Sequence, residues 1–258
     1  MLQQFQYFLV GLLTLPVFPL LLIQALVAKK GVGKLPEAIE PAGNTGGQSP
    51  PLHVLVIGES TVAGVGVKRH EEGITGAIGR RIHELTQRDV HWLSIGGSGY
   101  TAKKVANLLT EKIPDLPFEY VAIALGGNET FELNSPLKWK RNLKNLINRI
   151  REKLPEATIV IANMPPVGSF TAFPKTLQWY LGGLVNLHRK VIMDFPASFD
   201  KLVYLSEPID FDAWRQKTGR NVPMKEFFSD GVHPSALTYL LWGEQIAERA
   251  VNQLIIDS

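Results

Sequence analysis

Three residues of types that support nucleophilic catalysis lie in two distant parts of the chain. Ser60 follows the apolar run from Val54 to Ile57, so its hydroxyl would lie at the carboxyl end of a buried strand. A serine hydroxyl is a weak nucleophile at its ordinary pKa and needs a base beside it. Asp230 and His233 are three residues apart, so one turn could present both. His233 would accept the serine proton, and Asp230 would fix the imidazole tautomer.

Two glycine-containing segments could supply hydrogen-bond donors for the oxygen that gains charge in such a reaction. The segment 96–101 offers glycine N–H groups, and the segment 126–128 ends in an asparagine amide. Each feature also has an ordinary structural interpretation when it is taken alone. Ser60 could cap a helix, 126–128 could form a turn, and Asp230 and His233 could cap the last helix.

The elements that would position these residues alternate between strand and helix from residue 52 onward. Apolar strands are predicted at 52–57, 90–95, 120–125, 158–162 and 202–205. Helical apolar stripes lie between them, and a closing helix follows residue 236. This alternation predicts a flavodoxin-like three-layer α/β/α sandwich, an α/β fold with a five-stranded parallel sheet in the order 2-1-3-4-5. All four candidate segments would then gather at one edge of the sheet.

Taken together, the four segments resemble the four sequence blocks of the SGNH (GDSL-like) hydrolase family. They occur in the family's order across nearly all of residues 52–258. The blocks are Gly58-Glu59-Ser60, Gly99-Tyr100-Thr101, Gly126-Gly127-Asn128 and Asp230-Gly231-Val232-His233. One block alone is a weak signal, but four blocks in order are specific.

The resemblance implies a role for each matching residue. It makes Ser60 the nucleophile, His233 the base and Asp230 the partner of that base. It also makes Gly99 and Asn128 oxyanion donors, together with the backbone N–H of Ser60. No metal and no cofactor are expected.

The chain departs from the family's pattern at two positions. Glu59 replaces the usual Asp beside the nucleophile, and Tyr100 replaces a common Asp. Neither change removes a catalytic atom. Gly97 is a second candidate for the glycine donor if the alignment is shifted by two residues. The glycines at 97 and 99 also match part of a dinucleotide-binding fingerprint. They follow the second predicted strand instead of the first, and no acidic residue lies at the end of the third strand to bind a ribose, so a dinucleotide site is disfavoured.

The resemblance implies hydrolysis of acyl esters through an acyl-enzyme intermediate. An acyltransferase using the same three residues, or a catalytically silent binding module tethered to a membrane, are the alternatives. The aromatic segments 164–173 and 206–229 would either form an acyl pocket or pack the loops onto the domain. A membrane tether beside apolar loops favours a lipid or other small-molecule acyl ester as the substrate.

The N-terminal segment has the composition of a membrane helix. Residues 1–28 carry no charged side chain, and 22 mostly apolar residues run from Tyr7 to Ala28. This predicts an uncleaved single-pass anchor at 1–28, a Gly/Pro-rich linker at 29–51 and a catalytic domain at 52–258. A cleaved signal peptide, which would give a secreted or periplasmic protein, and a buried core helix are the alternatives. Three lysines after the segment, Lys29, Lys30 and Lys34, favour a cytoplasmic domain.

Composition excludes several other classes of function. The chain of 258 residues has no cysteine, which rules out disulfides, thiolate metal sites and a cysteine nucleophile. Its net charge of +3 is too small to indicate a nucleic-acid partner. The six histidines show no metal-ligand spacing. The sequence leaves the oligomeric state open.

Overall fold

The central sheet carries the five predicted parallel strands in the predicted order. The structure of the protein is a computed structural model that describes residues 2–46 and 50–257. The five parallel strands are β2 (Leu52–Gly58), β3 (Val90–Gly96), β4 (Phe118–Ala124), β5 (Thr158–Ile161) and β6 (Leu202–Tyr204). They are arranged as β3-β2-β4-β5-β6. The order places β2, the strand that ends before Ser60, near the middle of the sheet.

A sixth strand corrects the prediction of a purely parallel, five-stranded sheet. Strand β1 (Ala42–Thr45) pairs with the free edge of β3 in the antiparallel sense. It lies within the segment predicted as a linker, and Ala38 N–H also donates to Ala63 O at 2.9 Å. The sequence did not indicate β1 because its four residues, Ala-Gly-Asn-Thr, have no apolar alternation and include poor strand formers. The end of the predicted linker is therefore part of the sheet.

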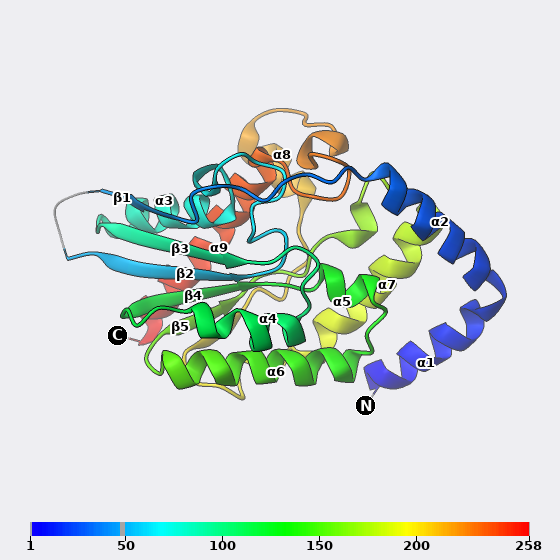
Figure 1. Cartoon of the computed structure of the whole chain (residues 1–258), viewed down its shortest axis with the longest axis horizontal. Coiled ribbons are helices and arrows are strands. Elements are labelled where there is room, and N and C mark those ends of the chain that lie inside the picture. Colours follow the sequence, from blue (N-terminus) through cyan, green and yellow to red (C-terminus); the bar gives the residue numbers. More distant parts are fainter. Residues whose placement is uncertain (1, 47–49, 258) are drawn as a thin grey trace.

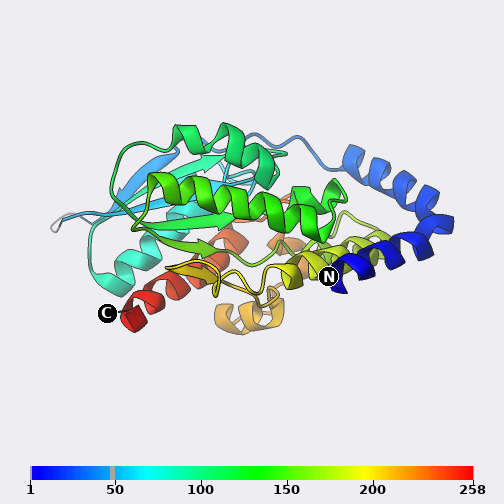
Figure 2. The ribbon, with the colours of Figure 1, turned by 90° about the horizontal axis from the view of Figure 1, so that it is seen from below.

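Helices cover both faces of the sheet and make three layers. They are α3 (Ile74–Thr86), α4 (Ala102–Leu108), α5 (Gly127–Phe131), α6 (Pro136–Lys153), α7 (Lys175–Val191), α8 (Phe211–Thr218) and α9 (Ala236–Asp257). Figure 2 shows α4 and α6 on one side of the strands and α3 and α9 on the other. Strands β2, β4, β5 and β6 are almost wholly buried, as their apolar runs predicted. The mixed α/β architecture expected from the sequence is confirmed.

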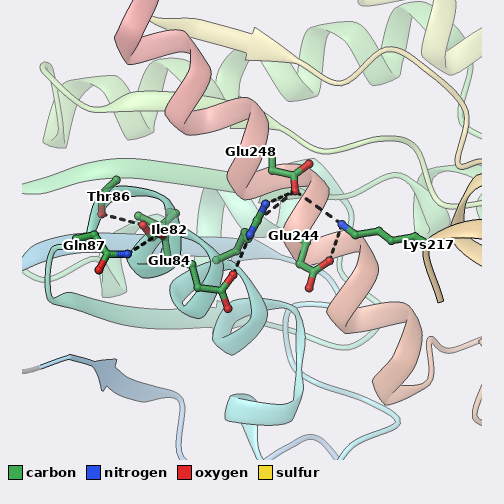
Figure 3. A network of polar contacts seen from close by, with 8 residues as sticks. Ile82, Glu84, Thr86, Gln87, Lys217, Glu244 and Glu248 are labelled. Carbon is green, nitrogen blue, oxygen red and sulfur yellow. Dashed lines mark hydrogen bonds and ion pairs between the residues drawn. The ribbon is translucent and has the colours of Figure 1, made fainter. Parts of the chain in front are cut away.

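Ion pairs join α9, the helix that follows the Asp230–His233 turn, to its neighbours (Figure 3). Arg81 on α3 contacts Glu248 on α9 at 2.9 Å. Lys217, at the end of α8, contacts Glu244 at 2.7 Å and Glu248 at 3.7 Å. Partly exposed pairs of this kind add at most about 1 kcal/mol each, so their main effect is on the orientation of α9.

The N-terminal apolar segment forms two helices instead of one. Helix α1 (Leu2–Thr14) and helix α2 (Phe18–Gly31) are separated by a 3-10 turn at Leu15–Val17. Pro16 lies within this turn and Pro19 follows it, and proline removes a helix hydrogen bond and clashes with the preceding turn. The whole segment Leu2–Gly31 is long and apolar enough to cross a membrane, judged by length and composition. In Figure 1 the two helices form a V whose arms return to the domain.

Polar contacts hold α1 and α2 against the α/β domain. Tyr7 Oη donates to Leu133 O at 2.7 Å, and Thr176 Oγ1 on α7 donates to Gln24 Oε1 at 2.7 Å. The outward faces of both helices remain exposed and apolar. An exposed apolar surface of this size is typical of a membrane or protein contact.

Candidate active site

Ser60 lies two residues beyond the end of β2, at the carboxyl edge of the sheet. The strand can end this close to β4 only because residue 58 is glycine. A Cβ atom at Gly58 would lie 2.1 Å from Ala124 O. The Ser60 O atom accepts the N–H of Val65 at 3.1 Å, which helps to fix the turn. The Ser60 N–H has no hydrogen-bond partner among the described residues, so it is available as a donor.

Asp230 and His233 form a hydrogen-bonded pair within one turn. Asp230 Oδ2 lies 2.8 Å from His233 Nδ1. The second carboxylate oxygen accepts the backbone N–H groups of Val232 at 3.0 Å and His233 at 2.8 Å. Gly231 has a φ of 87°, in the left-handed region that glycine adopts without strain. These contacts fix the Asp230 side chain against the imidazole.

The protonation state of Asp230 sets the tautomer of His233. Burial by itself would raise the pKa of Asp230, but hydrogen bonds from the His233 side chain and from two backbone N–H groups outweigh it and lower the pKa. An ionised carboxylate can only accept hydrogen bonds, so Nδ1 of His233 carries the proton. In the neutral ring, Nε2 then has a free lone pair with which to accept a proton.

The structure brings these residues together with Ser60 around one small cavity. Ser60, Asn128 and His233 all line this cavity, whose volume is about 40 Å³. No hydrogen bond joins Ser60 Oγ to His233 in the described part of the chain, and catalytic hydrogen bonds often tighten only in the substrate complex. Ser60 and His233, which are more than 170 positions apart in the sequence, thus line one cavity.

The backbone geometry distinguishes between the two glycine candidates for the oxyanion donor. Gly97 N–H donates to Gly58 O at 3.2 Å and is therefore occupied. Gly99 N–H has no partner within the described residues, and its φ of 76° needs glycine. Gly99 lines a larger cavity that also includes Asn128. These observations favour Gly99 over Gly97.

Glu59 holds Asn128, a contact that the sequence did not reveal. Its side chain is 3% exposed, and its carboxylate accepts the backbone N–H groups of Gly127 and Asn128, both at 2.9 Å. It also accepts Asn128 Nδ2 at 2.6 Å, while the same nitrogen reaches Tyr100 O at 3.2 Å. The only signal in the sequence was a carboxylate beside the nucleophile, longer than the usual Asp.

The environment of Glu59 raises the pKa of its carboxyl group to about 7. Burial is the main cause, and the nearby Glu129 carboxylate adds to it. The three hydrogen bonds from 127–128 oppose the shift, since they favour the charged form. The carboxyl group of Glu59, next to the candidate nucleophile in the sequence, therefore gains or loses its proton near neutral pH.

The aromatic residues of segments 164–173 and 206–229 divide between the two predicted roles. Phe170 and Phe228 line the small cavity beside Ser60, with ring centroids 5.4 Å apart. Phe173 lines the larger cavity. Three others pack against one another and fix α8 to the domain: Phe211, Trp214 and Phe227.

His188 has a structural role in the interior. It is buried on α7, and its Nε2 atom lies 2.7 Å from Asn134 O. Burial lowers the pKa of His188 to about 4, which keeps the ring neutral. No group of three or more His, Asp or Glu side chains in the described ranges 2–46 and 50–257 could hold a metal ion.

Comparisons with known proteins agree with this geometry. Residues 56–241 match the family model of the GDSL-like lipase/acylhydrolase family. The GDSL-like esterase Rv1075c of Mycobacterium tuberculosis is 25% identical to the chain over 193 residues. That match covers 74% of this chain and 59% of the relative, so the chain spans less than two thirds of the length of the relative.

Solved structures show the same fold at low sequence identity. TesA has a TM-score of 0.54 and 19% identity, over 78% of this chain and 97% of its own. The lipase Lip_vut3 from a goat rumen metagenome has a TM-score of 0.57 and 18% identity, over 77% of this chain and 97% of the lipase chain. A family 3 carbohydrate esterase of Clostridium thermocellum has a TM-score of 0.56 and 15% identity, over 80% of this chain and 98% of the esterase chain. With a family model that matches most of its length and a fold that these structures share, the chain belongs to the GDSL-like lipase/acylhydrolase family.

Proposed function

We propose that the protein is a membrane-associated serine ester hydrolase that cleaves acyl esters. The observation that carries this proposal is the Asp230–His233 pair, joined at 2.8 Å, at the cavity that Ser60 also lines. An ionised carboxylate, an imidazole with a free Nε2 and a serine at a strand end are the parts that acyl transfer needs. The family membership supports the same class of reaction.

In the proposed mechanism Ser60 Oγ attacks the acyl carbon while His233 Nε2 takes its proton. The carbonyl oxygen becomes an oxyanion, and the N–H groups of Ser60 and Gly99 and the amide of Asn128 donate to it. The alcohol leaves when the intermediate collapses, and it takes the proton from His233. Water then attacks the acyl-enzyme with the same base and releases the acid.

The two hydrogen bonds of Asn128 Nδ2 differ in length, and this supports its proposed role. The bond to Glu59 is 2.6 Å, while the bond to Tyr100 O is 3.2 Å. The shorter, charge-assisted bond is the stronger one. We expect Glu59 to keep its N–H and to position the amide, while the second N–H moves from Tyr100 O to the substrate oxyanion.

The apolar helices α1 and α2 support a position at a membrane. Their outward faces are exposed and uncharged up to Lys29, and the segment is long enough to cross a bilayer. Lys29, Lys30 and Lys34 at the end of α2 favour a cytoplasmic catalytic domain. Mass spectrometry of the mature, membrane-extracted protein tests whether the N-terminal segment is retained as an anchor. An N-terminus within the first residues supports an anchor, and an N-terminus near Lys29 would show a cleaved signal peptide instead.

The test of the proposed activity compares the wild type with Ser60→Ala in lipid nanodiscs. We expect the wild type to hydrolyse p-nitrophenyl butyrate and to be labelled at Ser60 by a fluorophosphonate. Ser60→Ala should lose nearly all turnover and labelling because the variant lacks the hydroxyl that the mechanism uses as the nucleophile. Ser98→Ala is the matched control, since it removes a hydroxyl from a neighbouring loop. Activity that survives in Ser60→Ala would refute the mechanism.

A further inference from the structure

A second, larger cavity adjoins the cavity of Ser60. It has a volume of about 650 Å³, within the usual range of small-molecule sites. Asn128, Phe131 and Val232 line both cavities, so the two spaces are neighbours at these side chains. The larger cavity therefore begins where the carbonyl group of a substrate would lie.

Two helices form the walls of this larger cavity. Helix α2 contributes one face, because its lining residues follow the spacing i, i+3, i+4 and i+7. These residues are Phe18, Leu21, Leu22 and Ala25. Helix α7 contributes the facing residues Leu177, Tyr180 and Leu181. Apart from the Tyr180 hydroxyl, the walls are apolar over this stretch.

The cavity changes from apolar to polar along α2. The apolar lining residues come first in the helix, and Lys29 and Lys34 come after them. Gly99 and Asn128, the proposed oxyanion donors, line the same cavity. An acyl ester has the same two parts, an apolar chain joined to a polar carbonyl group.

We propose that this cavity holds the acyl chain of a long-chain ester, so that α2 forms one wall of the substrate site. The inference rests on the proposed function, since it places the ester carbonyl at Ser60. The occupant is the hydrocarbon chain of the substrate itself. Its carbonyl would lie between Ser60, Gly99 and Asn128, and its chain would extend between α2 and α7 away from the lysines.

The exposed side of α2 offers a route by which an acyl chain could enter the larger cavity. Leu22 lines the cavity and is nevertheless 51% exposed, so the cavity is open at this helix. The outer face of α2 is apolar and would contact lipid if the segment lies in a membrane. A chain could then pass from the bilayer past Leu22 into the cavity without crossing water. The apolar N-terminal segment would thus select membrane lipids as substrates as well as tether the enzyme.

The first test fills the cavity from α2 and measures the response to acyl chain length. Ala25→Trp places an indole in the cavity, while Leu26→Trp is the matched control, because Leu26 is 53% exposed and lines none of the cavities described. Each methylene buried in the wild-type cavity should raise kcat/KM by up to about fourfold. We expect Ala25→Trp to lose at least about tenfold on p-nitrophenyl octanoate and to keep its activity on the acetate.

The outcomes of this test separate the inference from the proposed function. Leu26→Trp should behave as the wild type on both esters. An equal loss on both esters in Ala25→Trp, or no loss on either, would overturn the inference while the Ser60 mechanism stands. A wild type that hydrolyses neither ester would instead contradict the proposed function.

The second test does not depend on turnover. Full-length Ser60→Ala in nanodiscs is irradiated with dodecanoic acid that carries a terminal diazirine, and the cross-linked peptides are mapped. We expect labelling of α7 at Leu177–Leu181, reduced severalfold when Ala25→Trp is added and unchanged with Leu26→Trp. Labelling confined to the outer face of α2 would mean that the chain stays in the bilayer, and it would overturn the inference.

Discussion

The replacement Glu59→Gln tests whether the buried carboxylate positions Asn128. Glutamine keeps the size of the side chain but has only one oxygen. The carboxylate accepts N–H groups at both oxygens, from Gly127 at one and from Asn128 at the other. In the variant one of these N–H groups must face an NH₂ group, so a buried donor loses its acceptor. Such a loss costs about 1–3 kcal/mol and loosens the 127–128 turn.

The pH dependence of this effect follows from the pKa of Glu59. Burial raises that pKa to about 7 from its ordinary value of 4.5. Because the folded-state pKa is raised, the contribution of Glu59 to stability is complete below pH 4.5 and is lost as the pH rises to 7. The difference corresponds to about 3 kcal/mol. The unfolding free energy of the wild type relative to Glu59→Gln should therefore fall by about 3 kcal/mol between pH 4 and pH 8.

Catalysis should depend on pH in the opposite direction. Only ionised Glu59 can accept all three N–H groups, and a misplaced donor can cost up to about 10²-fold in rate. The ratio of kcat/KM between the wild type and Glu59→Gln should therefore rise with pH up to about 7 and then level off.

Two measurements check these expectations. Urea unfolding followed by the fluorescence of the buried Trp139 and Trp242 gives the stability difference, and p-nitrophenyl butyrate hydrolysis from pH 5.5 to 8.5 gives the rate ratio. Glu129→Gln is the comparison variant, and it should only shift the midpoint of the rate ratio to lower pH, because the Glu129 carboxylate raises the pKa of Glu59. It removes a neighbouring buried carboxylate that bonds Ala102 N–H and Asn134 instead of Asn128. A rate ratio for Glu59→Gln that is constant with pH, or highest in acid, would refute the positioning role.

Three further changes have defined outcomes. Asp230→Asn should lower kcat by about 10⁴-fold without unfolding the domain, because an amide no longer fixes the His233 tautomer; a loss below tenfold would argue against the pair. Asn128→Ala should lower kcat by about 10²–10³-fold with little change in KM, and a change in KM alone would assign it to ground-state binding. For His188 the folded-state pKa of about 4 lies below the ordinary 6.5, so stability present above pH 6.5 should fall by about 3 kcal/mol as the pH drops to 4. His188→Gln should lack this loss in urea unfolding, and an equal loss in the variant would contradict the assignment.

The parallel part of the sheet could be predicted because β2, β4, β5 and β6 each contain a run of apolar residues. Residues buried on both faces leave no polar positions, so β2 and β4 stand out in the sequence. β1 could not be predicted, because its pairing depends on the free edge of β3 and not on its own side chains. The apolar stripe of α3 was accurate in the interior of the helix and poorer at its end. Ile78 is buried, whereas Leu85 in the last turn of α3 is 40% exposed.

The candidate site could be predicted as far as it depends on residue type and position along the chain. Ser60, Asp230 and His233 follow strands or precede a helix, and topology alone brings those ends together. The role of Glu59 could not be predicted, since it depends on backbone N–H groups of 127–128, which are present at every residue. Only the path of the chain decides which of them face a carboxylate.

The position of α2 against the domain could not be predicted from the sequence of this helix. A helix that is apolar on every face predicts burial in lipid or protein, but it has no polar face to show which side meets the domain. The information lies instead on α7, whose residues Leu177 and Leu181 are buried partly by α2. In the proposed arrangement the outer face of α2 would contact lipid and its inner face would hold the acyl chain. Changes to the two faces should therefore affect tethering and chain binding separately.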